Sequence, residues 1–447
     1  DPADGSAAAA TLARALDRQA LLVAAGGLLP HGPGAHPPGP RCLGPLCRLA
    51  GAVPVLRLEL VPGERRELAW PLGWDGPLVL LAGVDGSVEC PDAALLAWAL
   101  PLPTPAERSQ GWRRHKVAPG LAATLARELR QGPSRIAAVG ATATLLAELA
   151  GRRRPGAADL GQAAQETARG LLEALAQPVS SPIDEAAFVA PTALRAELDL
   201  LLARCRARDG LEEGLGPAVA ARWQPGVRAL FSGPSGTGKT LAAAWLAGRL
   251  GLPLWRVDLA AVTSKWIGET EKNLAVLLAR AEAADVVLLF DEADALFGRR
   301  TDIKDSNDRF ANAQTNWLLQ RIETYEGIVL LTSNSRARFD PAFTRRLDMV
   351  VEFDPPAMAE RRSLWRAHLG PALDPRALDR LAALPDLTGG QIRSAVLAAA
   401  ARARSRAAPL TLADLGQAAA AEYRKQGRAP PPELEGLAGR TGPARDG

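Results

Sequence analysis

Short apolar segments separated by helical stretches predict a parallel α/β sheet in the second half of the chain. These segments lie at 229–231, 254–259, 286–290 and 328–331. The run at 286–290 has no polar position, which is typical of a strand buried on both faces of a parallel sheet. From 356 to 425 the pattern indicates helices alone. The chain is therefore expected to hold an α/β domain followed by a helical domain.

The first of these strands leads into a glycine-rich loop with the spacing G-x-x-x-x-G-K-T, and a helical pattern follows from Leu241. Such a loop between a buried strand and a helix is typical of a polyphosphate site, because its backbone N–H groups point inward toward anionic oxygens. Lys239 would reach the β- and γ-phosphates, and the Thr240 hydroxyl would ligate Mg²⁺. The nucleoside triphosphate site is predicted to consist of Gly233, Pro234, Ser235, Gly236, Thr237, Gly238, Lys239 and Thr240.

Two acidic residues, Asp291 and Glu292, directly follow the apolar run at 286–290. The carboxyl ends of parallel strands form the edge at which such sheets bind ligands. Asp291 would hold Mg²⁺ together with Thr240, and Glu292 would polarise the attacking water. Asn334 ends the last strand, where its amide would hold a water near the γ-phosphate. This arrangement predicts hydrolysis of the bound nucleotide.

Two adjacent arginines, Arg345 and Arg346, follow the last of these strands. An arginine supplied to a neighbouring subunit's nucleotide would stabilise the charge that develops in the transition state. The alternative is that both are ordinary surface residues of an arginine-rich chain.

With these motifs together, residues from about 185 to 430 resemble an AAA (AAA+) ATPase module. The resemblance places a Walker B segment at 286–292, a sensor-1 asparagine at Asn334 and arginine fingers at Arg345 and Arg346. It implies the P-loop NTPase fold class, an α/β three-layer sandwich with a parallel sheet plus an α-helical lid. It also implies ATP and Mg²⁺ as the bound ligands.

The segment S-K-W-I-G-E at 264–269 is similar to the pore loop of the meiotic clade of this family, such as katanin, spastin and the ESCRT-disassembling ATPase. In that clade Trp266, flanked by Lys265 and Ile267, would grip a protein substrate in the central pore of a hexamer. The second pore loop would lie at 302–309. A tryptophan packed at a helix N-terminus is the alternative interpretation.

Arg393, in the helical region, departs from the meiotic clade, which usually lacks an arginine at this place. It resembles the sensor-2 arginine of other AAA+ branches. That resemblance implies a contact from the lid to the γ-phosphate.

The first half of the chain resembles a decayed copy of the second half. Four blocks match in the same order, namely 48–60 with 249–259, 79–81 with 329–331, 107–115 with 360–368 and 158–164 with 413–419. Residues 31–38 lie where a phosphate loop should be, but they contain no lysine, and their prolines remove N–H donors. We therefore expect no nucleotide site in the copy. The alternative is an unrelated alanine-rich adaptor domain, which would also be catalytically silent.

Composition and charge exclude few classes of function. The net charge is +4, and there is no long basic run, so nucleic-acid binding is not indicated. The four cysteines form no C-x-x-C pair, which favours free thiols in a reducing compartment. The apolar stretch 20–29 is too short to span a bilayer and follows no signal peptide, so a cytoplasmic protein without membrane contact is expected.

The composition also suggests where the domains begin and end. The expected division is a degenerate AAA-like domain at 1–176, a linker at 177–191, the ATPase α/β core at 192–355, a helical lid at 356–427 and a disordered tail at 428–447.

Together these features favour an ATP-driven, ring-forming motor that remodels, disassembles or threads a protein substrate. Bacterial ATPases encoded with phage-tail-like contractile injection systems resemble most of this chain, including a degenerate first AAA copy. That resemblance implies a role in particle assembly, recycling or cargo loading. Two alternatives remain. A nucleic-acid motor or loader is suggested by Arg393 and the isoelectric point near 9.1, and a non-hydrolysing ATP-binding switch would have no need of Glu292.

Overall fold

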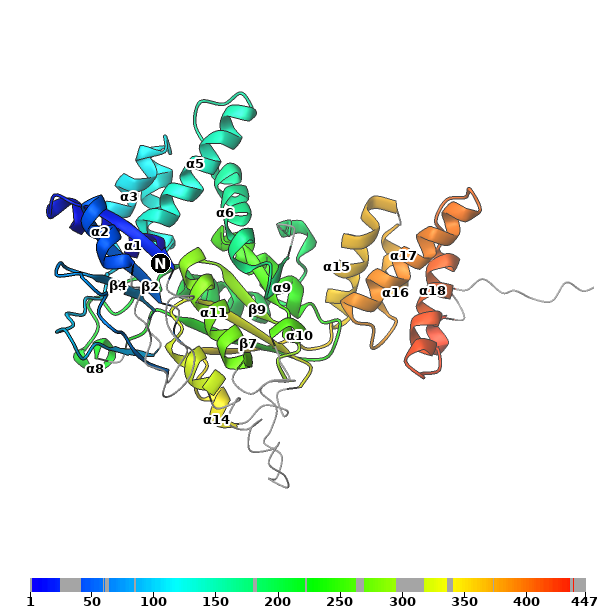
Figure 1. The fold of residues 1–447 in the computed structure, drawn as a ribbon. Helices are drawn as coiled ribbons and strands as arrows, with labels where there is room; N and C mark the ends of the chain where they lie inside the picture. Colours follow the sequence, from blue (N-terminus) through cyan, green and yellow to red (C-terminus); the bar gives the residue numbers. More distant parts are fainter. Residues whose placement is uncertain are drawn as a thin grey trace, which may run out of the picture.

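The computed structural model describes most of the chain. It covers residues 2–24, 42–58, 60, 64–83, 86–179, 183–221, 223–262, 269–294, 317–335, 341–372, 374–434 and 437. Within these ranges the chain forms a six-stranded sheet, a three-stranded sheet, a two-stranded sheet and two bundles of four α-helices (Figure 1).

The six-stranded sheet is the centre of the second half of the chain. In spatial order its strands are β11 (Met349–Glu352), β7 (Val227–Ser232), β10 (Ile328–Ser333), β9 (Val287–Phe290), β8 (Leu254–Val257) and β6 (Ala176–Pro178). The first five run parallel, and β6 pairs antiparallel with β8. Strands β7, β9 and β10 are buried at every position, which accounts for their apolar sequences. The predicted parallel α/β sheet is confirmed.

Helix α9 (Lys239–Leu250) begins in the glycine-rich loop after β7 and packs against β8 and β10. It ends at Gly251, whose left-handed backbone lets its N–H bond to the carbonyls of the last helical turn. Because α9 begins in the loop, its N-terminus lies at the same edge of the sheet as the loop. The other helical elements of this domain are η2 (Glu185–Ala187), α7 (Thr192–Arg206), α8 (Pro217–Ala220), α10 (Leu259–Val262), α11 (Glu269–Ala284) and α14 (Pro341–Thr344).

The C-terminal bundle confirms the predicted helical lid. It consists of α15 (Met358–Leu369), α16 (Pro375–Ala382), α17 (Gly389–Ser405) and α18 (Leu412–Lys425), followed by the short η5 (Pro432–Leu434). The disordered tail expected from 428 is wrong in its first part. Leu434 and Leu437 are 4% and 3% exposed and pack into the bundle core with Trp365, because these leucines remove apolar surface from water.

The N-terminal region contains two small parallel sheets. One has the order β1 (Gln19–Ala24), β2 (Ala52–Leu58) and β4 (Val79–Ala82), and the other pairs β3 (Arg65–Glu67) with β5 (Ser87–Glu89). Helices α1 (Pro2–Ala15) and α2 (Leu43–Ala50) pack against the three-stranded sheet. This region therefore has its own α/β structure, as predicted.

The strand order corrects one sequence match. Equating 79–81 with 329–331 makes β4 the counterpart of β10, which lies beside β7. A copy with that equivalence would place β4 beside β1, whereas β2 lies between them. Three apolar residues fit any strand of a parallel sheet, so they do not specify a place in it. The match does not identify equivalent strands.

A second four-helix bundle, α3 (Pro105–Arg114), α4 (Pro119–Glu128), α5 (Pro133–Leu149) and α6 (Ala157–Leu172), follows the small sheets. Its central arginine, Arg108, donates from Nε to the Ala126 carbonyl at 2.9 Å and from Nη1 to the Pro103 carbonyl at 2.8 Å. In the C-terminal bundle Arg361 donates in the same way to Ala382 at 2.9 Å and to Pro356 at 2.7 Å. The sequence match at 107–115 thus corresponds to one local structure built twice.

The predicted linker at 177–191 is wrong, because much of it belongs to the ATPase-like core. β6 extends to Pro178 and forms the sixth strand of the central sheet. Phe188 is 7% exposed and stacks on Trp245 of α9, with ring centroids 5.1 Å apart. The N-terminal bundle also shares a hydrophobic core with the central sheet, and α6 packs on α11. In Figure 1 this bundle lies above the sheet domain, whereas α15–α18 extend to the right of it.

None of the described helices is both long and apolar enough to cross a membrane.

Candidate active site

The glycine-rich loop folds at the carboxyl end of β7, where close packing requires glycines. A Cβ at Gly233 would collide with the Phe353 carbonyl oxygen, and the Gly233 φ is 153°. At Gly236 the φ is 80°, and a Cβ would lie 2.6 Å from Thr388 Oγ1 of the lid. Both positions hold a conformation that other residues rarely adopt. The spacing of the motif is therefore explained by the backbone geometry of the loop.

Lys239 lies inside this loop and is 8% exposed. Its Nζ donates to the carbonyls of Gly233 at 2.6 Å and Pro234 at 2.8 Å, and to Asn334 Oδ1 at 3.2 Å. Burial lowers the pKa of the Lys239 ammonium, while the nearby carboxylates, Asp291 first, oppose the shift. The amine is thus held where an anionic ligand of the loop would meet it.

Parallel register brings three strand ends to one edge. Ser333 of β10 is aligned with Ser232 of β7, and Leu331 is aligned with Phe290 of β9. The residues that follow these ends are the loop, Asp291 and Asn334. The structure therefore brings the predicted loop, acidic pair and asparagine together.

Asp291 and Glu292 follow β9 in different environments. Asp291 Oδ1 accepts hydrogen bonds from Thr240 Oγ1 at 3.4 Å and Thr332 Oγ1 at 2.6 Å. Glu292 is exposed and has a left-handed backbone, with a φ of 53°. The first carboxylate is thus tied to the loop, and the second is accessible to solvent.

The oxygens of this site fit Mg²⁺. Octahedral Mg²⁺ takes oxygen ligands at about 2.1 Å, so neighbouring ligand atoms lie about 3 Å apart. Thr240 Oγ1 and Asp291 Oδ1, 3.4 Å apart, lie near that separation. The cradle of backbone N–H groups and the buried Lys239 fit a polyphosphate.

The helical lid contacts the loop through its third helix. The Gly390 N–H, in the first turn of α17, donates to the Gly236 carbonyl at 3.0 Å. Arg393, one turn later, is exposed. Burial, and then the charge of Arg393, lower the pKa of the His368 imidazole. The structure thus places the Arg393 charge near His368 of α15.

The two candidate arginine fingers differ. Arg346 Nε forms an ion pair with Glu323 Oε1 of the same chain at 2.7 Å. Arg345 is exposed, and within the described part of the chain no ion pair of its guanidinium is found. Of the two guanidinium groups, that of Arg346 is thus tied to its own chain.

Comparison with known families decides the identity of this region. Residues 229–355 match the ATPase family associated with various cellular activities (AAA). The chain carries an AAA ATPase domain. Residues 357–425 match the contractile injection system ATPase helical domain, so the lid of this ATPase domain is of that type. Both family resemblances drawn from the motifs are confirmed.

Curated relatives are similar over part of the chain. The uncharacterized AAA family ATPase y4kL of Sinorhizobium fredii is 39% identical over 132 residues, 29% of this chain and 39% of that protein. The ATP-dependent zinc metalloprotease FtsH 3 of Sphaerobacter thermophilus is 33% identical over 214 residues, 45% of this chain and 42% of that protein. The 26S proteasome regulatory subunit 7 of Caenorhabditis elegans is 34% identical over 184 residues, 38% and 42% of the two chains. The chain thus spans less than half the length of each relative.

Several predicted site residues lie outside the described residues. They are Lys265, Trp266 and Ile267 of the first pore loop, the second pore loop at 302–309, and the N-terminal segment 31–38. The roles assigned to them stay predictions.

Sequence reasoning missed one residue of the site, Thr332. Its hydroxyl bonds to the acidic pair at the end of the neighbouring strand. The only available signal was a hydroxyl residue directly after the apolar run 328–331, and strand patterns do not reveal which neighbour such a group contacts.

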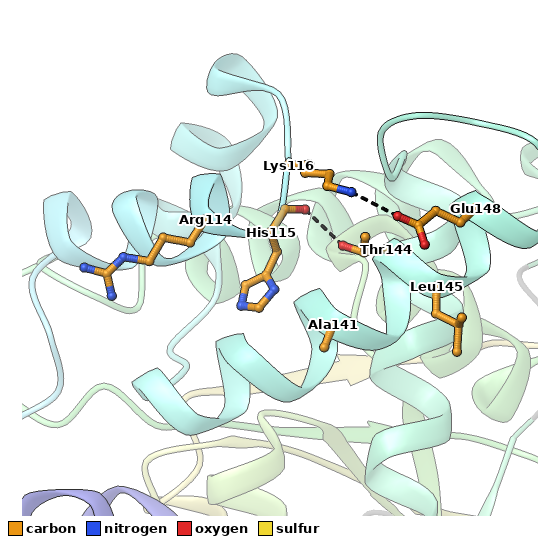
Figure 2. A pocket seen from close by; sticks show the side chains of 7 residues that line it. All are labelled: Arg114, His115, Lys116, Ala141, Thr144, Leu145 and Glu148. Atoms are coloured by element: carbon orange, nitrogen blue, oxygen red, sulfur yellow. Dashed lines mark hydrogen bonds and ion pairs between the residues drawn. The ribbon is translucent and has the colours of Figure 1, made fainter.

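A hollow lies far from the ATPase site in sequence, on the N-terminal bundle (Figure 2). Figure 2 shows Lys116 Nζ reaching Glu148 Oε1 at 2.9 Å and Thr144 Oγ1 donating to the His115 carbonyl at 3.1 Å. The charged groups of Lys116 and Glu148 neutralise each other there. No glycine-rich turn is among the residues that line this hollow, in contrast to the loop after β7.

Proposed function

We propose that this protein binds ATP with Mg²⁺ and hydrolyses it. The observation that carries the proposal is the convergence of Lys239, Thr240, Asp291, Glu292 and Asn334 at one edge of the central sheet. These residue types provide the parts that phosphoryl transfer to water requires, namely a phosphate cradle, a metal site and a carboxylate base.

Each side chain has a distinct role in this proposal. Lys239 binds the β- and γ-phosphates, and Thr240 with Asp291 holds the metal. Mg²⁺, when bound, neutralises charge that develops on the phosphate oxygens. Glu292, which is exposed beside the metal ligand, accepts a proton from the attacking water, and Asn334 orients that water. General-base catalysis of this kind contributes about 10²–10⁴-fold in rate.

We further propose that the active form is a ring-shaped homo-oligomer, a hexamer, that acts on a protein substrate. Arg345 supports this proposal, because its exposed guanidinium lies on the ATPase domain and can complete a neighbour's site. The relatives support it as well, since two of them are a proteasome regulatory subunit and an ATP-dependent protease. Trp266, with Lys265 and Ile267, is proposed to grip the substrate.

The match of residues 357–425 supports service to a contractile injection particle. The helical domain is the part of the chain that this family describes, and its helix α17 contacts the phosphate loop through Gly390. We propose that a protein of such a particle, or its cargo, is the substrate.

The first test compares the wild type with Glu292→Gln. Phosphate release should fall about 10²-fold or more in the variant, while binding of a fluorescent ATP with Mg²⁺ is retained. Light scattering of the ATP-bound variant should report a hexamer. Tight ATP binding by a wild type that releases no phosphate would favour the switch alternative.

The same variant identifies the substrate. Glu292→Gln held in ATP should retain one defined protein assembly on affinity capture, and the additional change Trp266→Ala should release it. Nucleic acid retained regardless of Trp266 would favour the loader alternative. Arg345→Ala should abolish turnover and spare ATP binding, because it would act on a neighbour's nucleotide.

A further inference from the structure

Thr332 is a buried hydroxyl residue at the end of β10, between the loop and the acidic pair. It is 1% exposed, and its Oγ1 takes part in two hydrogen bonds. The hydroxyl donates to Asp291 Oδ1 at 2.6 Å and accepts from the Glu292 N–H at 3.0 Å. One side chain of β10 therefore binds two consecutive residues that follow β9.

The backbone of Thr332 adds a third bond to the same turn. Its carbonyl accepts the Ala293 N–H at 2.9 Å. Asp291, Glu292 and Ala293 are thus all held by one residue of the neighbouring strand. Because β9 ends at Phe290, these three residues lie beyond its strand ladder and are bonded to β10 through Thr332.

Glu292 needs such support because its backbone is left-handed, with a φ of 53°. L-residues other than glycine rarely adopt this region, and they stay there only when surrounding contacts hold them. The bond from the Glu292 N–H to Thr332 Oγ1 is a contact of that kind. The orientation of the exposed Glu292 therefore depends on Thr332.

The hydroxyl also orients the metal ligand. Asp291 Oδ1 accepts from both Thr332 and Thr240, so the Thr332 proton directs this oxygen toward the phosphate loop. Loss of a group that hydrogen-bonds to a metal ligand typically lowers metal affinity or activity 10- to 100-fold.

We propose that Thr332 is a positioning residue that sets the geometry of both acidic residues at once. It directs the metal-ligating oxygen of Asp291 and fixes the backbone from which Glu292 reaches the attacking water. This inference rests on the proposed ATPase function. It assigns the coupling between metal binding and water activation to one hydroxyl group.

The test uses two substitutions of Thr332 and one control substitution. Thr332→Val keeps the β-branched shape and removes the hydroxyl, and Thr332→Ser keeps the hydroxyl. The matched control is Thr324→Val, since Thr324 is exposed and bonds only to carbonyls of its own helical turn among the described residues. The measurements are phosphate release at saturating ATP, the Mg²⁺ concentration for half-maximal effect, and the affinity for fluorescent ATP in EDTA.

We expect Thr332→Val to lower kcat about 30-fold or more and to raise the half-maximal Mg²⁺ concentration about 10-fold. ATP affinity in EDTA should change less than about threefold, because Lys239 and the loop are untouched. Thr332→Ser should stay within about fivefold of the wild type in both kcat and Mg²⁺ dependence. Thr324→Val should match the wild type.

Two results would overturn the assignment. One is a Thr332→Val variant with wild-type kcat and Mg²⁺ dependence, and the other is a Thr332→Ser variant as impaired as Thr332→Val, which would indicate packing of the methyl group. A wild type that releases no phosphate contradicts the proposed function instead. The Mg²⁺ dependence of ATP binding then still tests the Thr332 contact to Asp291.

Discussion

The two helical bundles have interiors of the same design, but they contact different parts of the molecule. Arg108 and Arg361 make the same pair of carbonyl bonds, and Trp112 and Trp365 are 1% and 0% exposed. The capping aspartates at the start of the last helices, Asp159 and Asp414, each accept from an arginine, and this hydrogen bond lowers the pKa of both carboxyls. The structure of the bundle is thus repeated down to single hydrogen bonds.

The outer contacts of the bundles are different. The N-terminal bundle bonds to the start of β9, with the Arg130 N–H donating to Asp285 Oδ2 at 2.9 Å and Arg135 Nε donating to the Ala284 carbonyl at 3.2 Å. Burial lowers the pKa of Arg135 to about 10, with Asp285 opposing, so the guanidinium is charged at neutral pH. The C-terminal bundle contacts the phosphate loop at Gly236.

The comparison indicates that the buried residues determine the structure of the bundle, whereas a few surface positions determine what the bundle contacts. At the start of α5 the N-terminal bundle has Pro133 and Ser134, where α17 has Gly389 and Gly390. Ser134, at the position of Gly390, donates its N–H to Asp4 Oδ1 at 2.7 Å and not to a phosphate loop, and a side chain at Gly390 would place its Cβ 3.2 Å from Gly236 Cα. We interpret the first bundle as a fixed brace and the second as a lid on the nucleotide site.

The largest effect is expected from removing the loop lysine. Lys239→Ala should lower ATP affinity at least 10³-fold, about 4 kcal/mol, because it deletes the buried cation of the site. Lys116→Ala, in the N-terminal bundle, removes an exposed ion pair to Glu148 and should leave affinity unchanged. Isothermal titration with ATP and Mg²⁺ measures both. Residual tight binding in Lys239→Ala would indicate a nucleotide site in the N-terminal half.

The two equivalent arginines, Arg108 and Arg361, should contribute unequally to the free energy of unfolding. Arg108 is 2% exposed and also pairs with Asp209, so Arg108→Ala should lower the free energy of unfolding by about 3 kcal/mol. Arg361 is half-buried and bonds to two carbonyls, so Arg361→Ala should lower it by about 1–2 kcal/mol. Urea unfolding followed by circular dichroism measures these values. Equal losses would contradict the view that the first bundle is fixed to the core.

A smaller effect is expected where the lid contacts the loop. A Cβ at Gly390 would lie 3.2 Å from Gly236 Cα, so Gly390→Ala should push α17 off the loop and weaken ATP binding about 3- to 10-fold. Gly389→Ala is the matched control, since its nearest contact would be an ordinary 3.6 Å. Fluorescent-ATP titration distinguishes the two. The same loss in both variants would show that helix propensity, and not the contact, is responsible.

The smallest effect is a pH dependence of the C-terminal bundle. Burial and Arg393 lower the pKa of His368, so the unfolded chain binds a proton more readily than the folded one. The contribution of neutral His368 to folding stability is therefore complete above about pH 6.5, the pKa of histidine in the unfolded chain. It is lost as the pH falls through the lower pKa of His368 in the folded protein. The melting temperature between pH 7.5 and 5.5 should fall less in His368→Gln than in the wild type. Arg393→Ala should lie between them, and a slope unchanged by either substitution would remove His368 as the cause.

Much of the ATPase site was predictable because its parts are local. The glycine spacing at 233–240 and the acidic pair after 286–290 each depend on a few consecutive residues. Parallel strands place their carboxyl ends at one edge, so these local motifs imply a common site without knowledge of side-chain packing. The repeat at 107–115 was visible for the same reason, since a buried arginine and tryptophan at fixed spacing stand out in helical sequence.

Other features depended on contacts between residues far apart in the chain. The place of β4, the ion pair that distinguishes Arg346 from Arg345, and the bonds of Thr332 to Asp291 and Glu292 all belong to this class. An apolar pattern states which face of an element is buried but not which partner covers it.

The sequence by itself therefore determined the nucleotide-binding chemistry, the α/β class and the presence of two related helical regions. Only the tertiary structure decided that one helical region braces the start of β9 while the other meets the phosphate loop. The physical reason is that chemistry at the site follows from short motifs on parallel strands, whereas docking depends on a few polar groups, such as Arg130 and Gly390, whose partners lie more than 150 residues away.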